Sequence, residues 1–175
     1  MKRQYFGYSR SNPARQARRL ELRLEYSCHR RCRELTHQPV RKEVTLKREI
    51  IRVEPLSTYL EKWKAPTSAV TRHGDTIYVS GFPPFDPVTG EVVNAPIERQ
   101  TELVLEQMKL CLETAGSSLE KVLKCNVYCT SVDKFASVNA IYARYFPKDP
   151  PARIFVNVPA WPGHFDIEID CIAAV

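Results

Sequence analysis

A long amphipathic helix is predicted by residues 97–116, which read IERQTELVLEQMKLCLETAG. Apolar and small side chains recur along it at spacings of three and four, which is the pattern of a helix packed on one side. This stripe consists of Ile97, Thr101, Val104, Leu105, Met108, Cys111, Leu112 and Ala115. Glu98 and Glu102 lie early, where the helix dipole favours anions, and Gly116 is a natural stop. We therefore expect this helix to pack against a second layer of the fold.

The segments on both sides of this helix predict strands and one further helix. The predicted strands span residues 48–53, 69–71, 76–80, 122–129, 154–158 and 165–173. The further helix is predicted over residues 132–145, with Phe135, Val138, Ile141, Tyr142 and Tyr145 facing inward. A glycine turn at residues 72–75 joins two of the strands as a hairpin. Residues 55–58 are interpreted as a break after the first strand.

This order of elements indicates a two-layer α+β domain, with both helices on one face of a mixed six-stranded sheet. Apolar residues occur on both sides of the predicted strands, for example Val127, Ile154 and Ile169. The sheet face without helices must therefore be covered as well. We expect identical subunits to cover it in a closed homo-oligomer.

Charge is distributed unevenly along the 175 residues. Residues 1–45 hold 12 of the 26 Lys and Arg and 4 of the 20 Asp and Glu, a net charge of +8. The other 130 residues hold 14 and 16, a net charge of −2, so the basic character does not indicate a nucleic-acid-binding domain. No apolar run is long enough to span a membrane, and no secretory signal is recognised. We expect a cytoplasmic protein whose six cysteines are reduced.

The basic segment of residues 1–45 lacks the pattern of a stable helix or strand. Three interpretations are open: an arm for nucleic acid or a membrane surface, an Arg-rich transit peptide, or an upstream extension from a start assigned too early. The last is favoured, because the compact pattern begins near Leu46. Cys28, Cys32 and His37, with His29, have side chains that zinc accepts. Their spacing is irregular and their neighbours are cationic, so no metal site is predicted.

Several motifs in the second part of the chain resemble the Rid (YjgF-type) family of reactive-intermediate deaminases. They are GDTIYVSG at 74–81, DPVTG at 86–90, AG at 115–116, VNAIY at 138–142, PAR at 151–153 and IEIDCIAA at 167–174. Each motif is weak alone, but the set in this order and spacing is specific. The resemblance runs from about residue 47 to the C-terminus, and residues 1–45 match nothing in the family. We expect a Rid-type domain at residues 46–175 and a basic, disordered extension at residues 1–45.

The resemblance implies a fold, an assembly and an activity. The fold is the chorismate-mutase-like α+β domain, assembled as a homotrimer with three ligand clefts, each between two subunits. The activity is hydrolysis of short-lived imines and enamines of 2-oxo acids, such as the tautomers of 2-aminoacrylate and 2-aminocrotonate. The products are the 2-oxo acid and ammonia. The expected partner is this small molecule, without cofactor, metal, nucleic acid or membrane.

Two residues are predicted to carry the chemistry. Arg153 offers a rigid, permanently charged fork that matches a carboxylate, and it lies between Pro151 and a strand. A carboxylate such as Glu168 can orient a water molecule or take its proton. From spacing alone, Arg153 is also typical of a surface arginine. Asp166, Glu168 and Asp170 alternate on one strand, which is also typical of an acidic face exposed to solvent. The resemblance favours Arg153 and Glu168 as site residues.

Four further residues are candidate substrate contacts. Ser80 offers a hydroxyl, and Gly81 lets backbone approach a ligand closely. The Asn139 amide both donates and accepts hydrogen bonds. Phe155 stands where the family often has cysteine, so its backbone N–H is available but no thiol is. A plain turn for Ser80 and Gly81 and a capping role for Asn139 are the alternatives.

The chain departs from the family pattern at two places. Thr67 stands where many members carry a tyrosine that lines the cleft, and Phe82 stands where glutamine is common. We expect the aromatic loops at residues 82–85 and 159–164 to line the pocket instead, and the substrates to be other than the smallest imines. His164 in the second loop is interpreted as a solvent-exposed residue, with acid-base chemistry as the alternative.

The same residues also allow functions other than imine hydrolysis. A regulatory trimer that holds a 2-oxo acid through Arg153 without turnover is the main alternative. A ribonuclease is disfavoured because residues 46–175 carry net negative charge. No nucleotide-binding or zinc-protease motif is present. The cysteines Cys111, Cys125, Cys129 and Cys171 are interpreted as small core residues.

Overall fold

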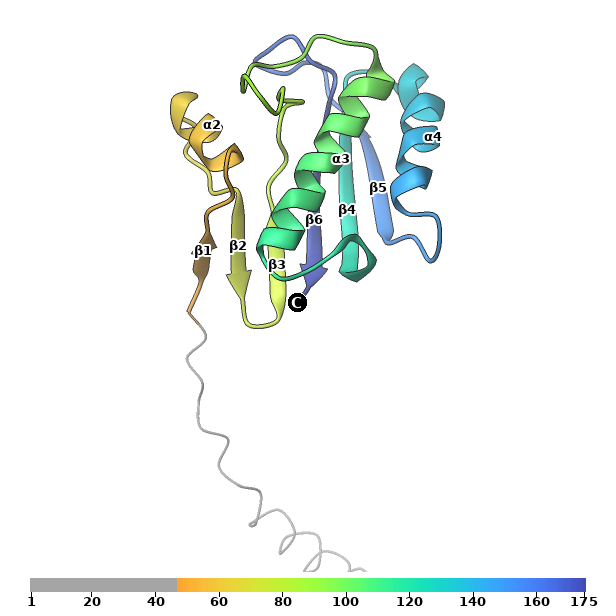
Figure 1. Cartoon of the computed structure of the whole chain (residues 1–175). Coiled ribbons are helices and arrows are strands. Elements are labelled where there is room, and N and C mark those ends of the chain that lie inside the picture. The colour runs from red at the N-terminus through yellow and green to blue at the C-terminus, as the bar shows by residue number, and fades with distance from the viewer. Residues whose placement is uncertain (1–46) are drawn as a thin grey trace, which may run out of the picture. The chain divides into compact units, whose positions relative to one another are not determined.

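Six strands form one sheet, in the order β1-β2-β3-β6-β4-β5, in the computed structural model, which describes residues 47–175 (Figure 1). The strands are β1 (Glu49–Ile51), β2 (Val70–His73), β3 (Thr76–Val79), β4 (Val122–Cys129), β5 (Ala152–Asn157) and β6 (Ile167–Ala174). Neighbouring strands are antiparallel except β4 and β5, which are parallel. The predicted sheet is thus confirmed in strand number and mixed character. The expectations for residues 1–45 lie outside the described residues.

Three α-helices accompany the sheet within residues 47–175: α2 (Leu56–Lys62), α3 (Ile97–Thr114) and α4 (Phe135–Tyr145). The helices α3 and α4 lie side by side on one face of the sheet (Figure 1). The bounds of α3 agree with the predicted helix, and Ala115 and Gly116 end it. None of the helices in the described part of the chain has the length and apolar character needed to cross a membrane.

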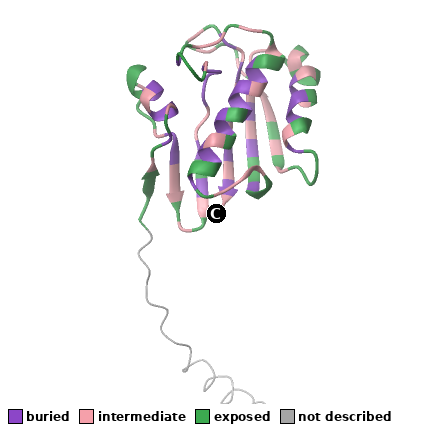
Figure 2. Ribbon diagram, in the orientation of Figure 1, coloured by how far each residue is buried: buried purple, intermediate pink, exposed green. Residues whose placement is uncertain are grey.

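The core lies between the sheet and the two long helices. Side chains of β6 alternate strictly, so that Ile167, Ile169, Cys171 and Ala173 are buried and the residues between them are half-buried. Figure 2 shows the buried surface where the helices meet the strands. Full burial of one large aliphatic side chain stabilises a fold by about 1.5–3 kcal/mol. The stripe predicted on α3 therefore supplies much of the stability of this layer.

The helix α2 is a correction to the prediction of a break after the first strand. Its residues Leu56, Tyr59 and Leu60 are buried, at the spacing of one helix face. The Ser57 hydroxyl accepts a hydrogen bond of 2.9 Å from the backbone N–H of Val53. Pro55 precedes the helix, which suits a first turn that needs no N–H donor. Because Ser and Thr beside a proline are also typical of turns, the short apolar spacing is hidden in the sequence.

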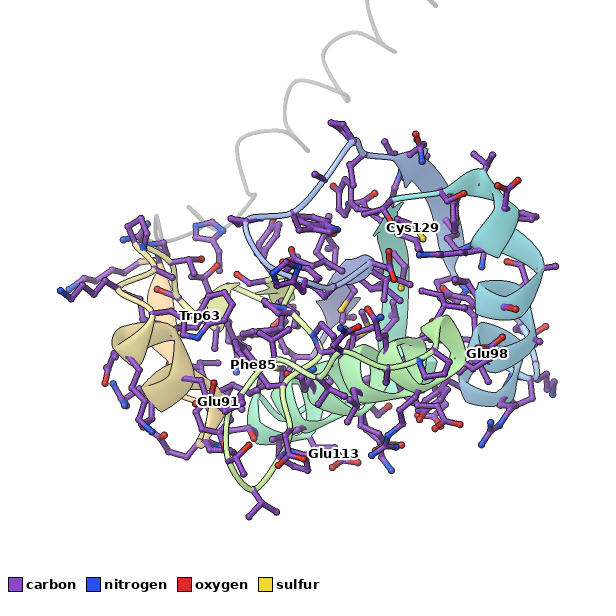
Figure 3. All side chains as sticks on the ribbon, turned by 90° about the horizontal axis from the view of Figure 1, so that it is seen from above. Trp63, Phe85, Glu91, Glu98, Glu113 and Cys129 are labelled. Carbon is purple, nitrogen blue, oxygen red and sulfur yellow. The ribbon has the colours of Figure 1, made fainter. Side chains whose placement is uncertain are left out.

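An aromatic cluster holds α2 against the rest of the domain. The ring of Phe85 lies 5.4 Å from both Tyr59 and Trp63, in edge-to-face geometry. Figure 3 shows Trp63 and Phe85 close together beside α2. Phe82 and Phe85 are 2% and 1% exposed. The expectation that residues 82–85 line a pocket is therefore wrong for these rings, because both belong to the hydrophobic core.

The segment predicted as one helix at residues 132–145 begins with a 3₁₀ turn, Val132–Lys134, and continues as α4. The Ser131 hydroxyl caps the turn by accepting a hydrogen bond of 3.1 Å from the Asp133 N–H. Val138, Ile141 and Tyr142 are buried as predicted, whereas Phe135 is 44% exposed. Phe135 does face the sheet, where its ring meets that of Phe155 on β5, but it lies at the start of α4 and at the margin of the core, so it is not buried.

Substitution of Gly90 tests the packing of α2. Gly90 has φ +72°, and an added Cβ would overlap the Tyr59 ring. Gly116 has φ +79°, with no atom within 4 Å of such a Cβ, so it is a matched control. We expect Gly116→Ala to destabilise by about 1–2 kcal/mol, from backbone strain alone. Gly90→Ala should cost about 1–3 kcal/mol more, from the added overlap. Urea unfolding of both variants measures this, and equal losses would contradict the packing described here.

Candidate functional site

Arg153 is held by three side chains of α4. Its Nη2 donates a hydrogen bond of 2.6 Å to Oδ1 of Asn139. Its guanidinium carbon lies 4.6 Å from the centre of the Tyr142 ring and 5.9 Å from that of Phe135. Cation–π contact at these distances orients the guanidinium and leaves its remaining N–H groups free to point elsewhere. Arg153 is half-buried, so its fork is fixed but still reaches the surface.

Phe155 extends the same group of residues along β5. Its ring lies 5.1 Å from that of Phe135, at an interplanar angle of 81°. The parallel register pairs Arg153 with Cys125 and Phe155 with Val127, both of which are buried beneath α4. Phe135, Asn139, Tyr142, Arg153 and Phe155 thus lie on the helix-covered face of the sheet. We call these five residues the Arg153 cluster.

The Tyr142 side chain is a supporting element of this cluster. It is 5% exposed, and its hydroxyl faces the buried Cys125 thiol. Burial raises the pKa of this phenol, so it stays neutral. A neutral phenol in this place contributes its ring face to Arg153 and is not a proton donor or acceptor for a ligand.

Glu168 lies on the opposite face of the sheet, which no α-helix of residues 47–175 covers and which we call the helix-free face. On β6 it pairs with Tyr128 of the neighbouring strand β4, and it is half-buried. Burial, together with the negative charge of Asp170, raises the pKa of its carboxyl from 4.5 to about 7. A carboxyl with this pKa is present in both protonation states near neutral pH. It is therefore suited to accept and return a proton.

Asp170 is the fixed neighbour of Glu168 on the same face. It accepts a hydrogen bond of 2.6 Å from Nδ2 of Asn126 and one of 3.2 Å from the Tyr128 hydroxyl. The Tyr128 ring in turn makes an edge-to-face contact of 6.5 Å with Trp161. The loop at residues 159–164 thus places an aromatic ring beside Tyr128, and its expected role in lining the pocket stays a prediction. Asp166 was predicted on the same face, but it lies before β6, where it binds Gln100 and Lys134.

Ser80 and Gly81 adjoin Glu168. A Cβ on Gly81 would lie 2.9 Å from Oε2 of Glu168, so glycine allows this close approach. The Ser80 hydroxyl donates a hydrogen bond of 2.8 Å to the Ser68 carbonyl and lies 3.3 Å from the Thr67 hydroxyl. An open hollow of about 630 Å³ lies beside these hydroxyls. We call Thr67, Ser80, Gly81, Glu168 and Asp170 the Glu168 cluster.

The two clusters do not meet within one chain. Arg153 projects toward α4, while Glu168 projects from the face that no helix covers, because successive residues of a strand point to opposite sides. The structure therefore brings Arg153 together with Asn139 and Phe155, and Glu168 with Gly81 and Ser80. It separates the two residues predicted to carry the chemistry.

Sequence reasoning missed the aromatic support of Arg153. Phe135, Asn139 and Tyr142 are spaced by four and three residues, so they share one face of α4. That spacing is the available signal, although the sequence predicts Phe135 and Tyr142 as core residues and Asn139 as a substrate contact or cap. The cysteines agree with their predicted role: Cys111, Cys125, Cys129 and Cys171 are free and buried. Burial raises the pKa of the Cys125 thiol to about 11, which keeps it protonated.

No metal site is apparent in the described part of the chain. Among residues 47–175, no group of three or more His, Cys, Asp or Glu side chains is arranged to hold a metal ion. His164 is exposed, as its interpretation as a solvent histidine requires. The arrangement offers two chemical functions: a cation that binds an anionic group and a carboxyl that exchanges protons.

Comparison with known proteins identifies relatives over the same part of the chain. The sequence model of the family described as "Endoribonuclease L-PSP" matches residues 62–175. A RutC family protein of Pyrococcus horikoshii is 43% identical over 62% of this chain and 86% of its own. The chloroplastic Reactive Intermediate Deaminase A of Arabidopsis thaliana is 34% identical over 75% of this chain and 68% of its own. The crystal structure of RidA from a Psychrobacter species is 35% identical, covers 63% of this chain and 89% of its own, and superposes with a TM-score of 0.61.

The pKa of Glu168 predicts a pH-dependent stability. Between about pH 4.5 and 7 the folded protein keeps this carboxyl protonated while the unfolded chain ionises it, so the folded state holds more protons. The wild-type protein therefore loses stability as pH rises through this window. Above about pH 7 its stability no longer changes through this carboxyl. Relative to wild type, Glu168→Gln should gain about 1–3 kcal/mol in stability between pH 5 and pH 8.

Denaturant unfolding of both proteins at the two pH values measures this gain. Glu113→Gln, which removes a carboxylate on the exposed side of α3 (Figure 3), corrects for the loss of one negative charge. A stability difference between Glu168→Gln and wild type that is the same at pH 5 and pH 8 would show that the carboxyl titrates normally.

Proposed function

Because this chain belongs to the Rid (YjgF-type) family, we propose that it hydrolyses imine and enamine intermediates of 2-oxo acids, releasing the 2-oxo acid and ammonia. The observation that carries this proposal is the half-buried Glu168 carboxyl with a pKa of about 7. A relative named Reactive Intermediate Deaminase A supports the same reaction class.

Arg153 binds the substrate carboxylate in this proposal. Its guanidinium is oriented by Asn139 and by the Tyr142 ring, so the fork is in place before the ligand arrives. A bidentate pair with a carboxylate then fixes the position of the neighbouring C=N group. The positive charge also draws electrons toward the carboxylate end of the molecule and favours attack on the imine carbon.

Glu168 manages the proton in this proposal. Its ionised form takes a proton from water as the water oxygen bonds to the imine carbon, and the carboxyl passes this proton to the nitrogen to give a carbinolamine. The carboxylate then takes the hydroxyl proton of the carbinolamine and passes it to the nitrogen, so that the C–N bond breaks, ammonia leaves and the C=O bond forms. One imine and one water thus give one 2-oxo acid and one ammonia. An enamine first becomes the imine by protonation at carbon.

A second subunit is needed to bring Arg153 and Glu168 to one ligand, because the sheet separates them within the chain. The helix-free face also presents large apolar side chains to solvent, with Ile50 56%, Tyr78 46% and Ile154 47% exposed. Such a face favours burial against identical subunits. We therefore propose a homotrimer in which the Arg153 cluster of one subunit faces the Glu168 cluster of the next.

Two other functions are distinguishable from this one. A regulatory trimer that binds a 2-oxo acid without turnover is favoured by Thr67, which offers no phenol to the ligand. Such a protein needs Arg153 but not Glu168. A ribonuclease, the activity in the family model's description, needs cationic contacts to phosphates, whereas residues 46–175 carry a net charge of −2.

Imine hydrolysis by variants tests the proposed function. An amino-acid oxidase generates imino acids in the presence of semicarbazide, which traps what the protein does not hydrolyse. Wild type should lower the trapped yield. We expect Arg153→Ala to lower kcat/KM at least about 100-fold, mainly through KM, because the carboxylate loses its fork. Glu168→Gln should lower kcat by about 10²–10⁴-fold and leave binding of the 2-oxo acid intact.

The outcomes separate the alternatives. Hydrolysis that survives Glu168→Gln would contradict the assigned proton transfer. If wild type hydrolyses no imine but binds pyruvate in an Arg153-dependent way, the protein is a binding protein on this fold. RNA cleavage by the wild type that is insensitive to both substitutions would favour the ribonuclease.

Mixed oligomers test the shared site. Arg153→Ala and Glu168→Gln subunits, unfolded together and refolded at equal amounts, should regain activity that neither variant has alone. Random assortment pairs an intact Arg153 with an intact Glu168 in about one quarter of the clefts, so about one quarter of wild-type activity is expected. Each variant refolded alone is the control. No recovery in oligomers shown by mass spectrometry to be mixed would mean that the site does not span subunits.

A further inference from the structure

Two phenylalanine rings beside Arg153 have no contact with the substrate in the function proposed above. Phe155 is half-buried on β5, and Phe135 is 44% exposed at the start of α4. Their rings meet edge to face at 5.1 Å. The Phe135 ring centre is only 5.9 Å from the guanidinium carbon of Arg153. A partly exposed phenyl pair next to a fixed cation is a surface for a ligand that is anionic at one end and apolar at the other.

We propose that Phe135 and Phe155 form an apolar wall that binds the substrate's side chain. The preferred substrates are then imino acids with large apolar side chains, as derived from branched-chain or aromatic amino acids. This inference rests on the proposed function, because Arg153 must first place the carboxylate. It goes beyond that function by naming the substrate class.

The geometry of a carboxylate on Arg153 carries the inference. In a bidentate pair the carboxylate oxygens lie about 2.8 Å from the guanidinium nitrogens, which puts the carboxylate carbon about 4 Å from the guanidinium carbon. The imine carbon and the first side-chain carbon follow within two bonds. A side chain of three or more carbons therefore reaches a ring whose centre is 5.9 Å from the same guanidinium carbon. A one-carbon side chain gains little from it.

The chemistry of the wall excludes polar side chains as well as small ones. Phe135 and Phe155 offer no hydrogen bond, so a second carboxylate or an amide placed against them loses water without a partner. Space for a larger group is available on the other side of the proposed cleft. There the small Thr67 and Ser80 border the hollow of about 630 Å³.

The substrate preference of the protein tests whether the apolar wall binds the substrate's side chain. The ratio of kcat/KM for the leucine-derived imine to that for the alanine-derived imine should be at least about ten in wild type, since each buried methylene is worth about three- to fourfold. Phe155→Ala should lower this ratio about tenfold, because the leucine-derived side chain loses its apolar contact. Phe155→Leu, which keeps apolar volume, should retain the ratio within about threefold.

Two further variants complete the test. Phe135→Ala changes an exposed ring and should lower the ratio even if Phe155→Ala does not fold. Val132→Ala is the matched control, because Val132 is apolar, 63% exposed and lies in the turn just before α4. Its ratio should equal that of wild type.

Each result supports or overturns the wall. A wild type that prefers the alanine-derived imine, or ratios unchanged in Phe155→Ala and Phe135→Ala, would overturn it. If wild type hydrolyses no imine, the proposed function fails, and calorimetry with 4-methyl-2-oxopentanoate and pyruvate decides about the wall. Tighter binding of the larger acid that is lost in Phe155→Ala supports the wall without catalysis. Equal binding of the two acids overturns the wall as well.

Discussion

The alternation of side chains across one sheet is the constraint on which this structure depends. The helices α3 and α4 cover one face, so every second residue of β4, β5 and β6 is committed to the core or its margin. The residues between them face the uncovered side. Arg153 and Glu168 fall on different sides of this division, although β4 alone separates their strands. The chemistry of the site therefore follows from which face each strand residue occupies.

The Arg153 cluster shows how a cation is kept ready at the margin of a core. The guanidinium exchanges part of its hydration for one amide oxygen and for the faces of two aromatic rings, of which Tyr142 is buried and Phe135 exposed. No carboxylate takes part in these three contacts, so the positive charge is oriented without being neutralised by them. The Glu168 cluster is arranged in the opposite way. There, burial and a neighbouring negative charge make ionisation harder.

Most of the fold was predictable because its signals are local. The long apolar stripe of α3, the alternation in β4 and the glycine turn after β2 each specify one element from adjacent residues. The helix α2 was not predicted, because its short apolar spacing lies among residues that also form turns. The pair of Arg153 and Asn139 could be named from the family resemblance, but not their contact. That contact depends on how the connection between α4 and β5 folds back, and the separation of Arg153 from Glu168 depends on the sheet register.

The place of β6 in the sheet has a consequence for how the protein is made. This strand is the last in the chain, yet it lies between β3 and β4 and pairs with both. On the ribosome, the segments of β1 to β3 and of β4 and β5 emerge with no strand to join them. The chain then loses the conformational entropy of closing the loop from Val79 to Cys171 in a single late step. This favours slow, all-or-none folding. A chain in which β6 has not yet paired therefore exposes two unpaired strand edges, at β3 and at β4, and such edges are templates for association with other chains.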